Sequence, residues 1–147
     1  MEMEPQKILG DLNADKNGFV AADFKVSAHC NRVNTIDGHM ECVSVKFKKE
    51  GVTVQQVIEA MREYKSEAQK LNLPSAPELP IQVFEVDNRP QPRLDRDAGK
   101  GMIVSVGRVR KCELFDVKFV LCSHNTVIGA AGGSIQNAEL AYAKGLL

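Results

Sequence analysis

An arginine and a histidine seven residues apart, Arg32 and His39, are the side chains best suited to chemistry in this sequence. A guanidinium can bind a carboxylate or phosphate through two parallel hydrogen bonds, and an imidazole can exchange protons near neutral pH. Asp37-Gly38 predicts a turn between them, because glycine adopts a positive φ without steric cost. Both side chains could therefore face one cavity, as catalytic residues would. The alternative is a surface arginine and a turn histidine, and the spacing alone favours that alternative.

Metal binding and thiol chemistry are the other uses of three histidines and four cysteines. The chain has no Cys-x-x-Cys or His-x-x-x-His pair, which argues against zinc. Residues 13–24 imitate a calcium loop with Gly18 at its sixth position, but Phe24 stands where such a loop has a glutamate. Calorimetry with calcium should therefore show no heat. Cys30 lies beside His29 in a strand-like run, where sequence neighbours point to opposite faces, so this pair does not predict a thiol–imidazole contact.

The composition describes one domain-sized chain without a strong electrostatic field. It has 147 residues, with 19 basic and 19 acidic side chains, so nothing would attract nucleic acid or an anionic membrane surface. No run approaches the roughly 18 apolar residues of a membrane span, and the acidic start is unlike a signal peptide. The cysteines lie in apolar or strand-like runs of a chain too large to need disulfides. We therefore expect reduced thiols and a cytoplasmic protein.

Hydrophobic periodicity predicts an α+β fold. Thr53 and Gln56 form a capping box, and apolar residues then recur at helical spacing to about residue 66. Alternating or continuous apolar runs predict strands, which we place at 24–32, 41–48, 81–86, 102–109 and 115–121. In the last of these, Phe115 should share the buried face with Val117. We expect a mixed, largely antiparallel sheet with the helix of residues 54–66 on one face.

The remaining segments predict connections and short helices. Residues 4–9 favour one helical turn, 71–80 contain three prolines and predict a connector, and 93–97 mix charges as a solvated loop or edge would. A helix from about 134 to 144 should end at Gly145. The small residues before it could admit an anion or carbonyl to the backbone, or could pack tightly against a sheet. The sequence does not rank those two alternatives.

Seven ordered segments resemble the C-terminal catalytic and dimerisation part of aspartate-semialdehyde dehydrogenases, most closely the archaeal and fungal branch. They extend nearly from end to end of the chain: EPQKILG at 4–10, SAHCNRV at 27–33, DGH at 37–39, LPSAP at 73–77, RPQPRLD at 89–95, SVGR at 105–108 and SHNTVIGAAG at 123–132. The resemblance implies a glyceraldehyde-3-phosphate-dehydrogenase-like C-terminal domain. It also implies NADP-dependent reductive dephosphorylation of β-aspartyl phosphate, a step of aspartate-pathway amino-acid biosynthesis.

The resemblance assigns roles to five side chains. His39 resembles the general acid/base, and Arg32 the arginine that binds the substrate carboxylate. Glu4 and Lys7 resemble the groups that hold the substrate ammonium and the phosphate. Asn125 resembles an amide near the nicotinamide carboxamide of NADP.

The resemblance also implies that part of the family's catalytic machinery has no counterpart in this sequence. None of the four cysteines matches the family's nucleophile, and the NADP-binding domain has no counterpart, so we expect an incomplete catalytic and dimerisation domain at 1–147 that is inactive alone and does not bind NADP tightly. Residues 129–147 would pack on the NADP-binding domain. We expect a homodimer formed through the sheet, with a tetramer as an option for the full enzyme. The alternative function is a non-catalytic dimerisation module, which mixed dimers with intact enzyme would reveal.

Overall fold

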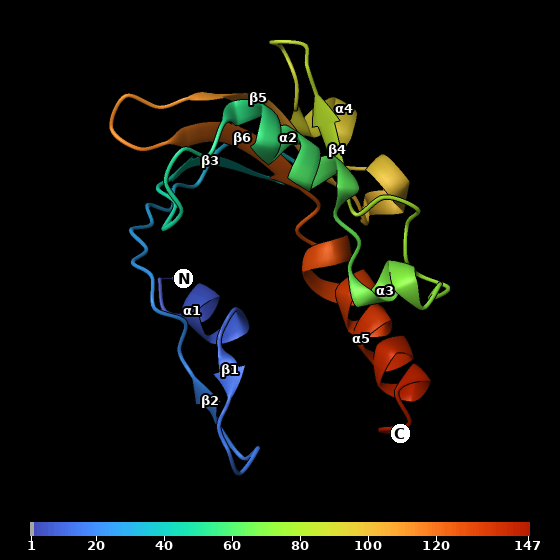
Figure 1. The fold of residues 1–147 in the computed structure, drawn as a ribbon. Helices are drawn as coiled ribbons and strands as arrows, with labels where there is room; N and C mark the ends of the chain where they lie inside the picture. Colours follow the sequence, from blue (N-terminus) through green and yellow to red (C-terminus); the bar gives the residue numbers. More distant parts are fainter. Residues whose placement is uncertain (1) are drawn as a thin grey trace. The chain divides into compact units, whose positions relative to one another are not determined.

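The computed structural model describes residues 2–147, which divide into two compact units. The first extends to Asn34 and the second comprises Thr35–Leu147. Figure 1 shows both as ribbons. Within residues 2–147, the helices are all too short or too polar to cross a membrane, and His, Cys, Asp and Glu side chains nowhere gather in threes to hold a metal ion.

The first unit contains a short helix and a small hairpin. Helix α1 (Glu4–Ile8) has Pro5 in its first turn, where the missing N–H costs nothing. Strands β1 (Asp11–Leu12) and β2 (Phe19–Val20) pair antiparallel. The side-chain oxygen of Asn13 accepts hydrogen bonds from the backbone N–H groups of Asn17 and Gly18 at 3.1 and 3.2 Å. The segment that imitates a calcium loop is therefore a hairpin, and Asn13, which would be the first calcium ligand, closes its turn instead.

The predicted strand at 24–32 is wrong. Residues 22–28 alternate between half-buried and exposed positions, as the sequence pattern suggested, but no strand of the described chain pairs with them. Side chains of α1 and its flank bind this segment instead: Gln6 donates to the carbonyl of Phe24 at 2.6 Å, and Glu2 accepts from the N–H of Ala28 at 2.7 Å. Alternation indicates an extended segment, whereas a strand also needs a neighbour with which to form a ladder.

The second unit is built on a four-stranded sheet in the order β3-β6-β5-β4. Its strands are β3 (His39–Val45), β4 (Ile81–Phe84), β5 (Val104–Lys111) and β6 (Val117–Ser123). The pairs β3–β6 and β5–β6 are antiparallel, and β4–β5 is parallel. The predicted mixed, largely antiparallel α+β fold is confirmed. Phe115 is a local exception, because it lies in the turn before β6 and is 46% exposed, whereas Val117 is 1% exposed.

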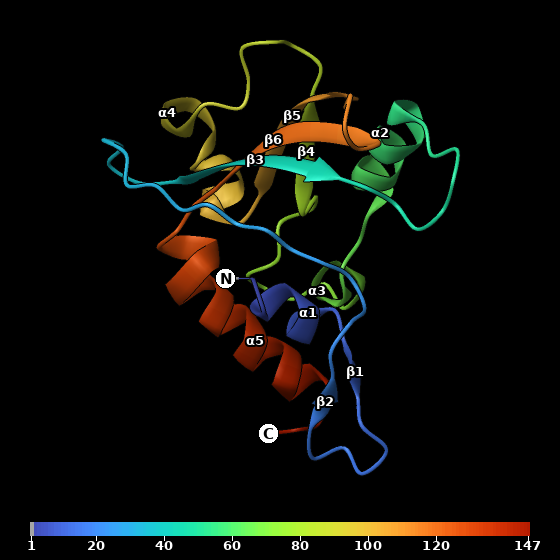
Figure 2. The same ribbon diagram turned by 90° about the vertical axis from the view of Figure 1, so that its left-hand side faces the viewer.

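Some of the helices contact this sheet and others contact one another, as Figure 2 shows from a second direction. Helix α2 (Val54–Glu63) begins with the predicted capping box and contacts β4 and β5. It ends three residues earlier than predicted, because Ser66 caps a further helix, α3 (Glu67–Lys70). The 3₁₀ turn η1 (Ala98–Gly101) precedes β5. A π-helical turn, η2 (Val127–Ala131), leads into α5 (Gly132–Ala143), after which Gly145 has the φ of +67° typical of a helix stop.

The segment predicted as a solvated loop or edge is largely a helix, α4 (Pro92–Asp95), which contacts β6. Proline at its first position favours helix initiation. Its last residue, Asp95, is 2% exposed rather than solvated. The prediction for 93–97 was therefore wrong, because the residue that satisfies this carboxylate is Arg89, outside the segment.

Candidate active site

The predicted acid/base residue lies directly after the turn that leads into β3. His39 is the first residue of β3, is exposed, and lies opposite Ser123 of β6 in the antiparallel register. Gly38 has a φ of +103°, a conformation that other residues adopt only with strain. Its N–H donates to the side-chain oxygen of Asn125 at 2.8 Å. Two predicted site residues, His39 and Asn125, are thus brought together through this turn.

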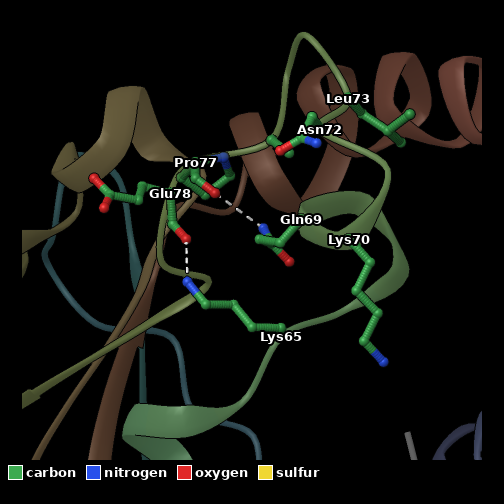
Figure 3. Close-up of a pocket in the computed structure, with 8 residues that line it drawn as sticks. Lys65, Gln69, Lys70, Asn72, Leu73, Pro77 and Glu78 are labelled. Atoms are coloured by element: carbon green, nitrogen blue, oxygen red, sulfur yellow. Dashed lines mark hydrogen bonds between the residues drawn. The ribbon is translucent and has the colours of Figure 1, made fainter.

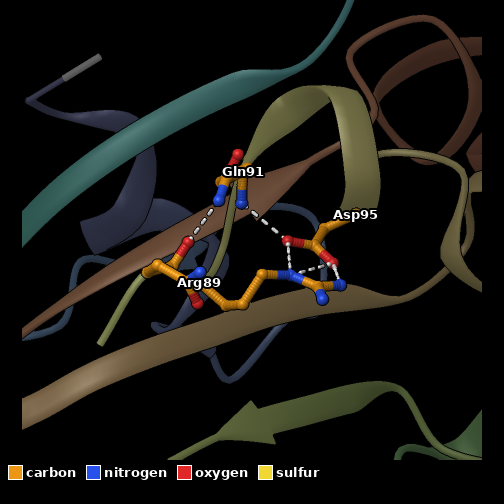
Figure 4. A network of polar contacts seen from close by, with 4 residues as sticks. Arg89, Gln91 and Asp95 are labelled. Carbon is orange, nitrogen blue, oxygen red and sulfur yellow. Dashed lines mark hydrogen bonds and ion pairs between the residues drawn. The ribbon is translucent and has the colours of Figure 1, made fainter. Parts of the chain in front are cut away.

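Helix α4 and the residue after it pack against the same turn. A Cβ atom added to Gly38 would lie 3.4 Å from the Cβ atoms of both Pro92 and Arg96. Those two residues flank Asp95, which accepts from the backbone N–H of Gln91 at 2.6 Å and from Nε of Arg89 at 2.8 Å. The Nη2 group of Arg89 donates to the other carboxylate oxygen. Figure 4 shows the guanidinium and the carboxylate facing each other.

The contacts of Asp95 determine its charge state. Burial alone would raise its pKa, but hydrogen bonds from Arg89 and from the N–H of Gln91, together with the positive charge of Arg89, lower the pKa below its usual value. The pKa of Arg89 is raised, chiefly by its hydrogen bonds to Asp95. The guanidinium also lies 4.4 Å from the centre of the Phe84 ring. Asp95 and Arg89 therefore form a charged pair at neutral pH that anchors α4.

His124 stabilises the loop that carries Asn125. It is 7% exposed, and its Nδ1 atom accepts from the backbone N–H of Thr126 at 3.3 Å. The other ring nitrogen, Nε2, lies 3.5 Å from a carboxylate oxygen of Asp97. Because Nδ1 is an acceptor, the ring proton is on Nε2, facing Asp97. Both ring nitrogens thus have structural partners, and His124 is not assigned a catalytic role.

The other three predicted site residues lie in the first unit. Glu4 and Lys7 are on α1, one turn apart, and both are exposed. The Lys7 ammonium lies 5.1 Å from the centre of the Phe19 ring, a cation–π distance. Arg32 is exposed in the extended segment after the hairpin. The shared pocket predicted for Arg32 and His39 would join the two units, and it stays a prediction.

A cavity of about 580 Å³ in the second unit lies elsewhere, beside α3 and the proline-rich connector. In Figure 3 Lys65 donates to the carbonyl of Glu78 at 2.7 Å and Gln69 to that of Pro77 at 3.1 Å. None of the five predicted site residues lines it. Its lining side chains hold the connector in place.

Sequence reasoning missed the Arg89–Asp95 pair and the second capping box. Ser66 and Gln69 have the same spacing as Thr53 and Gln56, and both reciprocal hydrogen bonds form. That signal was present and could have been found. No local signal marks Asp95 as buried, because its charged neighbours are those of an exposed loop.

A family match and a solved structure show that this fold is that of a semialdehyde dehydrogenase dimerisation domain. The profile of the family described as "Semialdehyde dehydrogenase, dimerisation domain" matches residues 1–128, so the chain belongs to this family. Its curated relatives are named aspartate-semialdehyde dehydrogenases. It is 55% identical to the one from Aspergillus fumigatus and 52% identical to the one from Schizosaccharomyces pombe, in each case over 100% of this chain and 42% of the relative.

A solved structure agrees with these relatives. The crystal structure of aspartate-semialdehyde dehydrogenase with NADP from Candida albicans superposes with a TM-score of 0.91 at 49% identity, over 99% of this chain and 42% of that one. The resemblance found in the sequence is thereby confirmed. This chain spans about 42% of the length of the relatives it matches.

Proposed function

We propose that this chain is the catalytic and dimerisation part of an aspartate-semialdehyde dehydrogenase. Such an enzyme reductively dephosphorylates β-aspartyl phosphate to aspartate semialdehyde, with NADPH as the hydride donor. The main support is the identity of 47–55% to fungal and archaeal enzymes of that name, which extends over 95–100% of the chain. The glycine turn that presents His39 supports the placement of an acid/base group at this point of the fold.

The chain's own residues take the roles that the resemblance suggests. His39 acts as the general acid/base, which accepts and donates the proton that the reaction transfers, a role suited to an exposed imidazole. Arg32 binds the substrate carboxylate through its two-pronged guanidinium. Glu4 holds the substrate ammonium and Lys7 the phosphate, and their positions one turn apart on α1 are compatible with contacts to a single small molecule.

The amide of Asn125 suits one end of NADP. Its oxygen already accepts from Gly38, which leaves the two Nδ2 hydrogens as donors. Donors of that kind match the oxygen of a nicotinamide carboxamide, so Asn125 fits this end of the cofactor. Close packing at the start of α5 requires its glycines, because a Cβ on Gly132 would lie 2.6 Å from the Met102 sulfur and one on Gly133 would lie 2.4 Å from the backbone oxygen of Ile128.

The family description of a dimerisation domain supports assembly. We assign this chain a homodimer formed through its sheet, with a tetramer as the further option. Helix α5 and the residues around it, 129–147, would pack on the NADP-binding domain. In support, α5 contains no buried residue, and Ile135 and Tyr142 are 57% and 76% exposed. Reduced thiols at the four cysteines would suit the cytoplasm, where this biosynthetic role would place the protein.

His39→Asn tests the proposed chemistry in the protein that carries this chain. The assay is the phosphate-dependent reduction of NADP by aspartate semialdehyde, the reverse of the biosynthetic direction. We expect kcat to fall roughly 10²- to 10⁴-fold, the usual contribution of a positioned acid/base, with little change in KM. His29→Asn is the matched control, because it makes the same change at another exposed histidine. A His39→Asn enzyme that keeps wild-type kcat would refute the assignment.

Arg32→Lys tests substrate binding separately. Lysine keeps the charge but loses the two parallel hydrogen bonds, so KM for aspartate semialdehyde should rise while KM for NADP stays unchanged. Equal changes in both constants would contradict the assigned carboxylate contact.

A further inference from the structure

The side chain of Asn125 reaches across 87 positions of sequence to the turn that presents His39. Its oxygen accepts from the N–H of Gly38 at 2.8 Å, and both groups are partly buried. A backbone N–H can bond only to an acceptor, so this contact fixes the orientation of the Asn125 amide. Asn125 lies two residues after Ser123, the partner of His39 in the β3–β6 register.

Three contacts therefore converge on two consecutive residues. The ladder to β6 sets the position of His39, α4 limits Gly38 from one side, and Asn125 holds the Gly38 N–H. The ladder begins only at His39, so it does not restrain the peptide group that joins Asp37 to Gly38. The turn has a glycine with a φ of +103°, and glycine retains wide conformational freedom unless contacts remove it. The hydrogen bond from Gly38 to Asn125 is the polar contact that restrains this peptide group.

We propose that Asn125 is a positioning residue for His39, acting through the Gly38 N–H. This inference rests on the proposed function, because it takes His39 as the acid/base group. It adds a role to the cofactor contact proposed for the Nδ2 hydrogens: the oxygen of the same amide sets the direction in which the imidazole leaves the turn. Catalysis depends on such placement, and a shift of about 1 Å can cost 10²-fold in rate.

Two substitutions separate the oxygen of Asn125 from its amide hydrogens. Asn125→Asp keeps an acceptor for the Gly38 N–H and loses the Nδ2 donors. Asn125→Leu has a similar size and loses both. The readouts are amide hydrogen exchange at Gly38, followed by NMR, together with kcat and the KM values for NADP and aspartate semialdehyde. Exchange at Val106, which is 2% exposed in the central strand β5, reports whether each variant remains folded.

If Asn125 positions His39, Asn125→Leu speeds Gly38 exchange about fivefold to tenfold, as loss of one hydrogen bond should. It also lowers kcat at least tenfold, with Val106 exchange and KM for aspartate semialdehyde unchanged. Asn125→Asp restores the protection of Gly38 and recovers most of kcat, measured at the optimum pH of each variant. A raised KM for NADP in both variants would reflect the loss of the amide hydrogens alone.

Two results would overturn the inference. One is a Leu variant with wild-type Gly38 exchange and kcat. The other is an Asp variant with restored Gly38 protection and a kcat as low as that of the Leu variant. All these variants are made in the complete enzyme that carries this chain, as for His39→Asn. Failure of the proposed function has a different signature, because that complete enzyme without any substitution would then reduce no NADP with aspartate semialdehyde and phosphate.

Discussion

Removing the carboxylate of Asp95 should destabilise the chain more than any surface ion-pair change. Asp95 is 2% exposed and accepts from three donors: Nε and Nη2 of Arg89 and the N–H of Gln91. Asp95→Ala leaves the half-buried backbone N–H of Gln91 without its acceptor and a guanidinium without its counter-charge. Both groups would have to find water or remain unpaired.

The magnitude follows from these contacts. Removing one partner of a buried ion pair typically costs about 3–5 kcal/mol. The Arg89 side chain is 27% exposed, so water can partly replace its lost partner, and we place the cost near the lower end, at about 3 kcal/mol. For a chain of this size, each kcal/mol lowers the melting temperature by roughly 2–4 °C. The variant should therefore melt roughly 10 °C below the wild type.

Urea unfolding followed by circular dichroism measures this effect. The matched control is Glu85→Ala, which breaks the ion pair with Arg62 on the surface, where the two side chains are 73% and 43% exposed. Such pairs contribute less than about 1 kcal/mol. If Asp95→Ala and Glu85→Ala lower the free energy of unfolding equally, the Arg89–Asp95 pair does not anchor α4 as argued.

Three further predictions follow from single features. The pKa of Asp95 is lower in the folded chain than in the unfolded chain, so the stability that this carboxylate contributes should be complete above about pH 5 and be lost as the pH falls through the folded pKa. The urea midpoint of Asp95→Asn should therefore fall less than that of the wild type when the pH is lowered. Thr53→Ala should cost about 1 kcal/mol in a thermal melt, whereas Thr53→Ser should keep the cap of α2. Gly38→Ala should cost about 1–3 kcal/mol because of its φ of +103°, and a smaller loss would show that the turn adapts.

Features determined by neighbouring residues could be predicted from the sequence. The capping box at Thr53 involves atoms three residues apart, and the turn at Gly38 needs only a glycine. Residues 42–48, which begin within β3 and continue past its end at Val45, show the expected alternation, with half-buried positions every second residue. The sheet has the predicted mixed class because these local patterns agree with one another.

Features that depend on a distant partner could not be predicted from pattern alone. Residues 22–28 have the alternation of a strand, yet no strand of the described chain pairs with them. Asp95 has the charged neighbours of a loop, yet it is buried beside Arg89. The partner of Gly38 is 87 residues away, and nothing in either segment indicates the contact.

The charged pair beneath the His39 turn has a geometric consequence that an apolar pair would lack. Buried ion pairs are often no more stabilising than apolar side chains of similar volume, so stability alone does not account for Arg89 and Asp95. A guanidinium and a carboxylate, however, meet in one planar arrangement, which fixes direction as well as distance. Because Pro92 and Arg96 lie one turn apart on either side of Asp95, fixing the carboxylate fixes the rotation of α4 and how it packs against Gly38. The position of the acid/base candidate thus depends on charges that never touch it.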